Sequence, residues 1–352
     1  MSGVWLACES DVHSGLVFWS CVGILGMVAL VAIDLTIVRA IGGSRRRRHQ
    51  ELERQWLPLL IAGLEQPPDR LPLLQARDIT WFCTLWIRLH DAIKGVHDPL
   101  HTIAARTGVA DGVRRMFFRK NRGDRLLAIA MLGRLQDRTL WDELVQLASD
   151  RDVILSLGAA QSLVRIDATK AIRLLLPIIA TRDDWTPATV AAMLELAGPT
   201  AISTELAEAI PRTPSSQAHR LIRFLRLAHA DVAAPLLRSL IRHVEHVESV
   251  TACLRAFTDA DDLDAVRPYL RHPRWEVRLR AVETLGRLAT AEDEEQLTAM
   301  LADREWWVRY RTAHALCQLF ANDLVRVSLL QAFHPDPFAR DILAHVLAER
   351  AA

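Results

Sequence analysis

Leucine recurs at a nearly constant interval through the chain beyond residue 122. Successive leucines of the series stand 31 residues apart, except for one interval of 29 residues between Leu225 and Leu254. The series consists of Leu132, Leu163, Leu194, Leu225, Leu254, Leu285, Leu316 and Leu347. Leucine is common in this chain, so one coincidence means little, but eight positions with a single slip indicate an internal repeat.

Each leucine of the series belongs to an apolar helix stripe. Four residues before it stands an apolar residue in every repeat except one, which has Thr312, and three residues after it an apolar residue in all but the last, which has Arg350. Positions i, i+4 and i+7 share one face of an α-helix. A second helical segment follows in each repeat, for example residues 139–149 and 293–303. Each repeat is therefore predicted to be a hairpin of two helices.

Neither helix of such a hairpin can bury its apolar stripe alone, so the hairpins must stack. The predicted fold class is all-α, with residues 123–352 forming a right-handed α-solenoid of about eight hairpins of about 31 residues each. The presence of only two tyrosines, beside abundant leucine and alanine, argues against an all-β protein.

Some repeats share a motif. In residues 272–288 and 303–319 a polar turn precedes a Val-Arg pair, and a helix of small residues follows; residues 150–166 are similar. These segments resemble the HEAT-repeat family in its short bacterial form, and the resemblance covers roughly residues 123–352. It implies the solenoid fold, and it implies that turn residues such as Arg278, Arg309 and Asp303 bond along the solenoid. A fold of this kind does not by itself define a function.

The chain begins with a different pattern. Residues 15–33 carry no charge over 19 positions, and ten of them are Leu, Ile, Val or Phe. At about 1.5 Å per residue they would span roughly 28 Å, close to the thickness of a bilayer core. A buried core helix of this length rarely lacks all charge, and a cleaved signal peptide needs a basic start, whereas residues 1–14 contain Glu9 and Asp11 and no Lys or Arg. We therefore expect a transmembrane helix over residues 14–41.

Positive charge follows this segment and predicts its orientation. By the positive-inside rule residues 1–13 form an extracytoplasmic tail, and the rest of the chain lies on the cytoplasmic side of the cell inner membrane, as a single-pass protein with its N-terminus out. The same arginines are expected to contact anionic lipid head groups rather than nucleic acid. They are Arg39, Arg45, Arg46, Arg47 and Arg48.

Two segments connect the span to the repeats. Residues 42–68 are expected to form a basic juxtamembrane helix that ends at two prolines, and residues 69–122 a helical N-terminal cap. Within the cap, residues 78–94 have apolar residues at helical spacing, with Asp78 as the expected N-cap and Gly95 as the expected stop.

Charge and composition narrow the function classes. The 43 Lys and Arg residues against 42 Asp and Glu residues give a net charge of +1, which argues against a generally basic nucleic-acid binder. With 51% hydrophobic and 24% charged residues the chain is not disordered. The large excess of arginine over lysine favours a GC-rich bacterial genome.

Candidate chemistry is sparse. The five cysteines form no CxxC pair, so a disulfide framework or a zinc site is not expected. His90-Asp91 and His97-Asp98 are His-Asp pairs of the kind that bind metal in phosphohydrolases, but the further ligands are missing. A phosphate-binding glycine loop and a nucleophile elbow are also missing. We predict no catalytic residue, no metal and no cofactor; the alternative is a membrane-tethered HEAT-like enzyme, either a lyase or a metal-dependent hydrolase.

The remaining candidates concern partners. Trp275, Trp306 and Trp307 stand beside repeat turns, where they either pack between neighbouring repeats or anchor a partner protein. Asp34, at the cytoplasmic edge of the span, either reaches head-group water or contacts a cationic group of a partner membrane protein.

The expected function is therefore a membrane-anchored scaffold that binds a protein partner. Bacterial proteins of this layout resemble those encoded beside membrane glycosyltransferases for exported polysaccharides. This resemblance implies a glycosyltransferase as partner and a place in a polysaccharide-synthesis or export complex.

Overall fold

The computed structural model describes residues 48–64, 68, 70–93 and 98–351, which contain helices and turns and no strand. They divide into two compact units on either side of the Gly112–Val113 bond. The expected tail and transmembrane helix, residues 1–41, lie outside the described residues. Among the helices that are described, none combines the length and the apolar character needed to cross a membrane.

The first unit is built from short helices around a core of large side chains. It contains a helix over residues 48–62, α2 (Ile79–Ala92), α3 (Asp98–Thr107) and the start of α4 (Val109–Phe117). Trp56 and Phe82 are buried and meet edge to face at 4.9 Å. Trp86 is also buried, and its indole Nε1 donates a hydrogen bond to the Leu100 carbonyl at 3.1 Å. The apolar spacing of α2 therefore marks its core face, as expected.

Helix α2 begins differently from the prediction. Asp78 occupies the N-cap position, but its side chain makes no capping hydrogen bond. The buried carboxylate instead pairs with the Arg48 guanidinium, whose Nη2 lies 2.8 Å from Oδ2. Leaving a buried charge without a counter-charge costs more free energy than leaving a helix end without a side-chain cap, so the Asp78 carboxylate pairs with Arg48.

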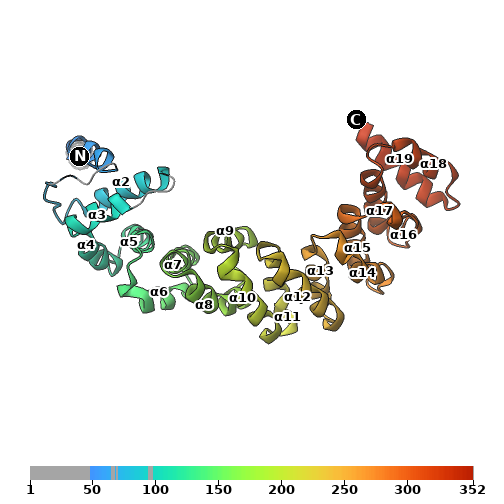
Figure 1. Ribbon diagram of the computed structural model, residues 1–352, viewed down its shortest axis with the longest axis horizontal. Helices are drawn as coiled ribbons and strands as arrows, with labels where there is room; N and C mark the ends of the chain where they lie inside the picture. The colour runs from blue at the N-terminus through green and yellow to red at the C-terminus, as the bar shows by residue number, and fades with distance from the viewer. Residues whose placement is uncertain (1–47, 65–67, 69, 94–97, 352) are drawn as a thin grey trace, which may run out of the picture. The chain divides into compact units, whose positions relative to one another are not determined.

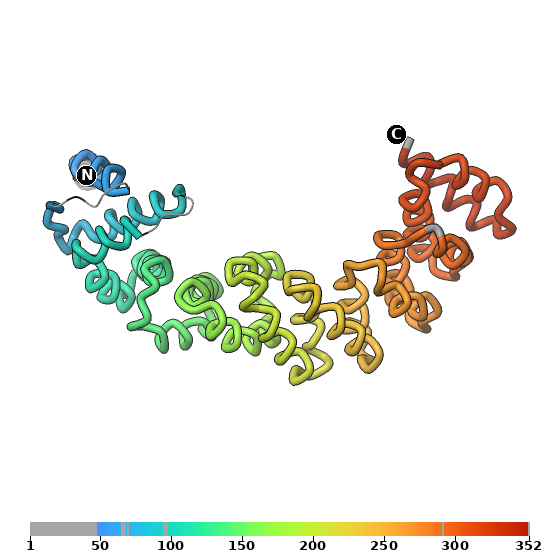
Figure 2. Tube along the Cα trace, viewed as in Figure 1, coloured from blue at the N-terminus to red at the C-terminus, as the bar shows by residue number. Residues whose placement is uncertain are grey.

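The second unit consists of consecutive helix pairs (Figure 1). About eight hairpins were expected, and the unit contains seven helix pairs followed by a single helix, α19. Figure 2 shows how the chain turns back from one helix to the next. The pairs are α5 (Arg122–Leu135) with α6 (Trp141–Ala148), α7 (Val153–Ile166) with α8 (Ala168–Thr181), α9 (Pro187–Ala197) with α10 (Pro199–Ala209), α11 (Ser215–Ile222) with α12 (Ala230–His243), α13 (Val247–Ala256) with α14 (Leu263–Val266), α15 (Trp275–Leu288) with α16 (Glu294–Met300), and α17 (Trp306–Leu319) with α18 (Leu324–Phe333), before α19 (Pro337–Ala351).

Polar turn residues start many of these helices. The Asp152 carboxylate accepts hydrogen bonds from the Ile154 and Leu155 amides at the start of α7. Asn121 and Asp167 cap α5 and α8 in the same way. Each cap satisfies backbone N–H groups that have no partner within the helix, and so sets the residue at which the helix begins.

The leucine register marks the core of the second unit. Seven of the eight leucines, all but Leu347, are fully buried, and the residues four positions before them are all buried. Leu347 is only partly buried, and α19 instead buries Leu343 and Val346. The 31-residue spacing therefore identifies buried core positions of the repeats, as predicted, although Leu225 lies just beyond the end of α11.

Neighbouring first helices approach closely. A Cβ added to Gly286 would lie 2.6 Å from the Cβ of Ala315, and one added to Gly133 would lie 2.8 Å from the Cα of Ser162. Hydroxyl groups join the same helices, because Ser162 Oγ donates to the Ile129 carbonyl at 2.7 Å. Small residues therefore stand where one repeat touches the next.

The stack of first helices is interrupted once. Helices α5, α7 and α9 pack in sequence, as do α11, α13, α15, α17 and α19, but α11 packs against α8 as well as against α13. This interruption lies outside the three segments that share the repeat motif, residues 150–166, 272–288 and 303–319. Two of the pockets described below border it.

Candidate functional site

Two exposed tryptophans stand together at the start of α17. Trp306 is 43% exposed and Trp307 is 54% exposed. The Trp306 ring stacks on Tyr310, with centroids 5.0 Å apart and planes inclined by 12°, because residues four apart share a helix face. Trp307 meets Trp306 edge to face at 4.7 Å. We call Trp306, Trp307 and Tyr310 the aromatic cluster.

The aromatic cluster is hydrogen-bonded to α19 through Tyr310. The Tyr310 hydroxyl donates to the Glu349 carboxylate at 3.0 Å, and this hydrogen bond raises the pKa of Tyr310. His314 and His345 place their Nε2 atoms 3.4 and 3.1 Å from the same carboxylate. Burial lowers the pKa of His314, although Glu349 opposes that effect. The tyrosine is thus held from one side, which fixes the ring on which Trp306 stacks.

Trp275, the third candidate tryptophan, stands apart from this cluster. It is the first residue of α15, one repeat earlier, and its side chain is partly buried. It lines a shallow pocket together with Glu248, Leu279 and Arg280. The structure therefore brings two of the three predicted tryptophans together at the surface.

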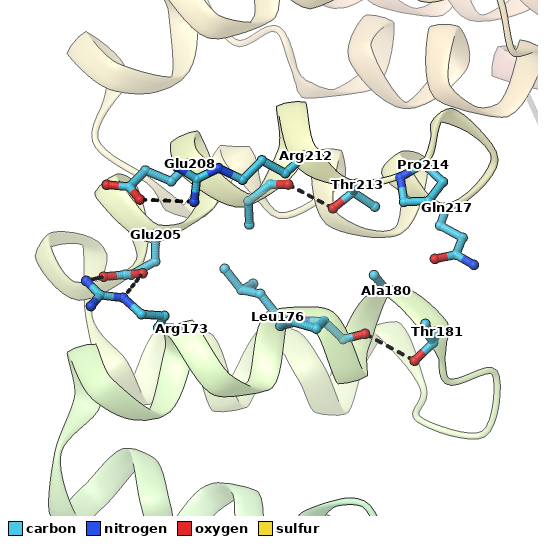
Figure 3. A pocket seen from close by; sticks show the side chains of 12 residues that line it. Arg173, Leu176, Ala180, Thr181, Glu205, Glu208, Arg212, Thr213, Pro214 and Gln217 are labelled. Atoms are coloured by element: carbon cyan, nitrogen blue, oxygen red, sulfur yellow. Dashed lines mark hydrogen bonds and ion pairs between the residues drawn. The ribbon is translucent and has the colours of Figure 1, made fainter.

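A small pocket between α8 and α10 was not anticipated from the sequence. It encloses about 330 Å³, and Leu176, Pro177, Ala180 and Ala209 supply apolar lining (Figure 3). At one end the Arg173 guanidinium donates to both Glu205 carboxylate oxygens, at 3.0 and 2.7 Å. The available sequence signal was Pro177 within a helix, since a proline there removes a backbone hydrogen bond and kinks or breaks the helix.

Several polar groups around this pocket already have partners within the chain. Glu208 lies 3.6 Å from Arg212, and the Thr181 and Thr213 hydroxyls donate to carbonyls of their own helical segments. Figure 3 shows these bonds running along the rim. The pocket therefore offers an apolar surface for a small side chain.

The other candidates are placed as follows. Arg48 pairs with Asp78, whereas Asp34, Arg39 and Arg45 to Arg47 lie outside the described residues. His90 is buried, and its ring stacks on Trp86 with centroids 4.9 Å apart. Over the described ranges, no group of three or more His, Cys, Asp or Glu side chains is arranged to hold a metal ion. His97, in the second His-Asp pair, is not among those residues.

Comparisons with known proteins concern mainly the C-terminal repeats. A family model described as HEAT repeats matches residues 234–317 and 263–349. Both of the best-matching motif segments, 272–288 and 303–319, fall within these residues, so HEAT-like repeats are present there as predicted. A comparison with curated proteins gives no match.

Among solved structures, the chain resembles the crystal structure of an engineered protein. The two are 16% identical, and the similarity covers 78% of this chain and 83% of that one, with a TM-score of 0.35. A similarity at this level carries no argument about function.

Proposed function

We propose that this chain is a non-catalytic scaffold that binds a partner protein through exposed residues of its helical repeats. The aromatic cluster carries the proposal. Tryptophan is the residue most enriched among those that dominate binding energy at protein interfaces. Two tryptophans, 43% and 54% exposed, stand side by side on a regular helix whose Tyr310 is fastened to Glu349.

The repeat architecture supports the same role. Each hairpin packs mainly on its neighbours, so a stack presents side chains from successive first helices along one continuous surface. HEAT-like repeats over residues 234–349 include the helix that bears the aromatic cluster. A partner could therefore contact several repeats at once with little reorganisation of the scaffold.

The proposal also gives the scaffold a place at the membrane and a class of partner protein. Residues 14–41 act as a single transmembrane helix with the N-terminus out, and Arg39 and Arg45 to Arg48 lie at the cytoplasmic surface of the bacterial inner membrane. The uncharged residues 15–33, followed by this arginine run, support the orientation. We propose a membrane glycosyltransferase of exported-polysaccharide synthesis as the partner. A cytoplasmic reporter fused after Ala352 should be active, and activity of a periplasmic reporter there would contradict the orientation.

The experiment that tests the scaffold role is co-purification from detergent-solubilised membranes. The full chain should retain a stoichiometric protein partner, which mass spectrometry identifies. The double variant Trp306→Ala/Trp307→Ala should lose it while keeping its helical circular dichroism spectrum. Phe118→Ala is the matched control, because Phe118 is 66% exposed and belongs to the second unit, far in sequence from α17. Equal retention by both variants would contradict the proposal.

A further inference from the structure

A basic pocket lies beside the interruption in the helix stack. It encloses about 670 Å³ and is bordered by the start of α9 and by the C-terminal ends of α11, α13 and α15. Cationic or titratable nitrogen groups line it on several sides. They are His219, Arg223, Arg226, Arg255 and Arg287.

Three of these arginines recur at a regular interval. Arg223, Arg255 and Arg287 stand 32 residues apart, at the end of the first helix of three successive repeats. The stacking of the repeats therefore brings together side chains that are distant in sequence. The negative ends of the three helices favour cations there, and this alone would explain isolated arginines.

The arginines of this pocket lack carboxylate partners, whereas arginines nearby have them. Arg220 pairs with Asp183, Arg274 with Glu276, and Arg280 with Glu283. By contrast, within the part of the chain that is described, the guanidinium groups of Arg226 and Arg255 have neither an ion pair nor a hydrogen bond.

The other two arginines of the pocket bond only to backbone carbonyls. Arg223 reaches the His219 carbonyl at 3.4 Å, and Arg287 donates to the Phe257 carbonyl at 2.7 Å. His219 contributes a further unsatisfied group, since its Nδ1 is buried and has no hydrogen-bond partner among the described residues. A carbonyl satisfies a donor but does not neutralise a guanidinium charge.

The crowding of positive charge is electrostatically unfavourable in the empty pocket. Burial lowers the pKa of both the Arg223 and the Arg255 guanidinium, and repulsion from neighbouring arginines lowers it further, although Glu283 opposes this effect at Arg255. Glu248 is the carboxylate among the lining residues, and it lies 3.0 Å from Nδ1 of His246. Each helix end contributes roughly half a negative charge, so four guanidiniums exceed these opposing charges.

We infer that this pocket binds an acidic segment of the partner polypeptide, with aspartate or glutamate side chains accepting hydrogen bonds from Arg223, Arg226 and Arg255. The inference rests on the proposed scaffold function and names the chemistry of its partner. Guanidinium and carboxylate groups match in geometry and form charge-assisted, often bidentate, hydrogen bonds. A carboxylate from the partner would add to the counter-charge that Glu248 and the helix ends supply only in part.

An acidic polypeptide fits the surroundings better than a nucleic acid does. The pocket continues into neighbouring hollows of mixed charge. One contains Asp183 beside Arg182 and Arg220, and the other contains Glu245 and Glu276 beside Arg274 and Arg280. A phosphate backbone is charged at every step and would meet these carboxylates, whereas a polypeptide can place acidic side chains at the pocket and neutral or basic ones beside it.

Fluorescence anisotropy with a fluorescein-labelled hexaglutamate peptide tests the inference on the full chain. The double variant Arg223→Gln/Arg255→Gln should bind the peptide at least about tenfold more weakly than wild type. The matched control is Arg242→Gln/Arg271→Gln, which removes the same charge from exposed arginines of the second helical segments of neighbouring repeats. The control should bind within about twofold of wild type, and single substitutions allow the same comparison if a double variant does not fold.

Other outcomes overturn the inference. Equal weakening by both double variants would mean that only net charge matters. Tighter binding of a labelled ten-nucleotide oligothymidine than of the peptide would identify the pocket as a nucleic-acid site. In co-purification, the variant Arg223→Gln/Arg255→Gln should lose the partner, as the variant Trp306→Ala/Trp307→Ala does. If the arginine variant keeps the partner while the tryptophan variant loses it, the acidic-segment inference is refuted and the scaffold role remains. Absence of any partner from wild type would refute the scaffold role.

Discussion

Arg278 and Asp303 form a buried ion pair between two consecutive repeats. Nε and Nη2 of Arg278 on α15 donate to the two carboxylate oxygens of Asp303, at 2.7 and 2.8 Å, and each side chain is only 7% exposed. Asp303 also accepts a hydrogen bond from the Glu305 amide, and Arg278 donates to the His272 and Pro273 carbonyls. One pair of side chains therefore holds the turns of both repeats.

Removing the acid should be costly. Asp303→Ala leaves the Arg278 charge buried without its partner, and we expect a loss of about 3–5 kcal/mol in the free energy of unfolding, measured with urea. The control is Glu276→Ala, which breaks the exposed pair with Arg274. An exposed pair contributes little, so the control should unfold close to wild type. Similar losses in the two variants would show that the buried pair has no special role.

The same pair should make stability depend on pH. Burial alone would raise the pKa of Asp303, but the hydrogen bonds from Arg278 and the Glu305 amide outweigh it and lower the pKa below its ordinary value. A lowered folded-state pKa stabilises the fold above the unfolded pKa of about 4, and this contribution is lost as the pH falls through the folded pKa. The stability difference between wild type and Asp303→Asn should therefore shrink between pH 6 and pH 3. A constant difference would contradict the assignment.

Glycines of the repeats should respond differently to substitution by alanine. At Gly286 a Cβ would lie 2.6 Å from the Cβ of Ala315, so Gly286→Ala should destabilise the chain by about 1–3 kcal/mol despite the better helix propensity of alanine. At Gly158 the nearest atom is 3.6 Å away, so Gly158→Ala should be neutral or stabilising by up to about 1 kcal/mol. Thermal unfolding of both variants checks this. Stabilisation by Gly286→Ala would mean that α15 and α17 are less closely packed.

The repeated core was predictable because it depends on local periodicity. Leu163 and Leu285 are buried where the register places them, since i, i+4 and i+7 positions must share a helix face in any context. The role of Arg278 followed from the family resemblance, because its motif marks a turn that recurs. Leu347 departs from the register as a member of the last helix, which buries Val346 instead.

The candidate sites were less predictable because they depend on contacts between repeats. Net charge is a sum over the chain, so a value of +1 gives no indication that Arg223, Arg255 and Arg287 line one pocket. Their 32-residue interval also differs from the 31-residue leucine register, and it became meaningful only when the packing of α11, α13 and α15 was known. Sequence alone also left open whether Trp306 and Trp307 were packed inside or exposed.

Residues 122–351 form a stack of helix pairs, ended by α19, in which each repeat is stabilised by its neighbours. Hydrogen exchange on Leu285→Ala tests it. Leu285 is fully buried, so the substitution should cost about 2–5 kcal/mol, and exchange should accelerate in α13, α15 and α17 while α5 and α7 stay protected.

The control is Glu283→Ala, two positions away, where the partly exposed carboxylate pairs with Arg280 and Arg311 and the cost should be below about 1 kcal/mol. We predict a localised loss of protection for Leu285→Ala and little change for the control. A loss spread evenly over the whole chain, or equal effects of the two substitutions, would contradict the repeat architecture on which the proposed scaffold depends.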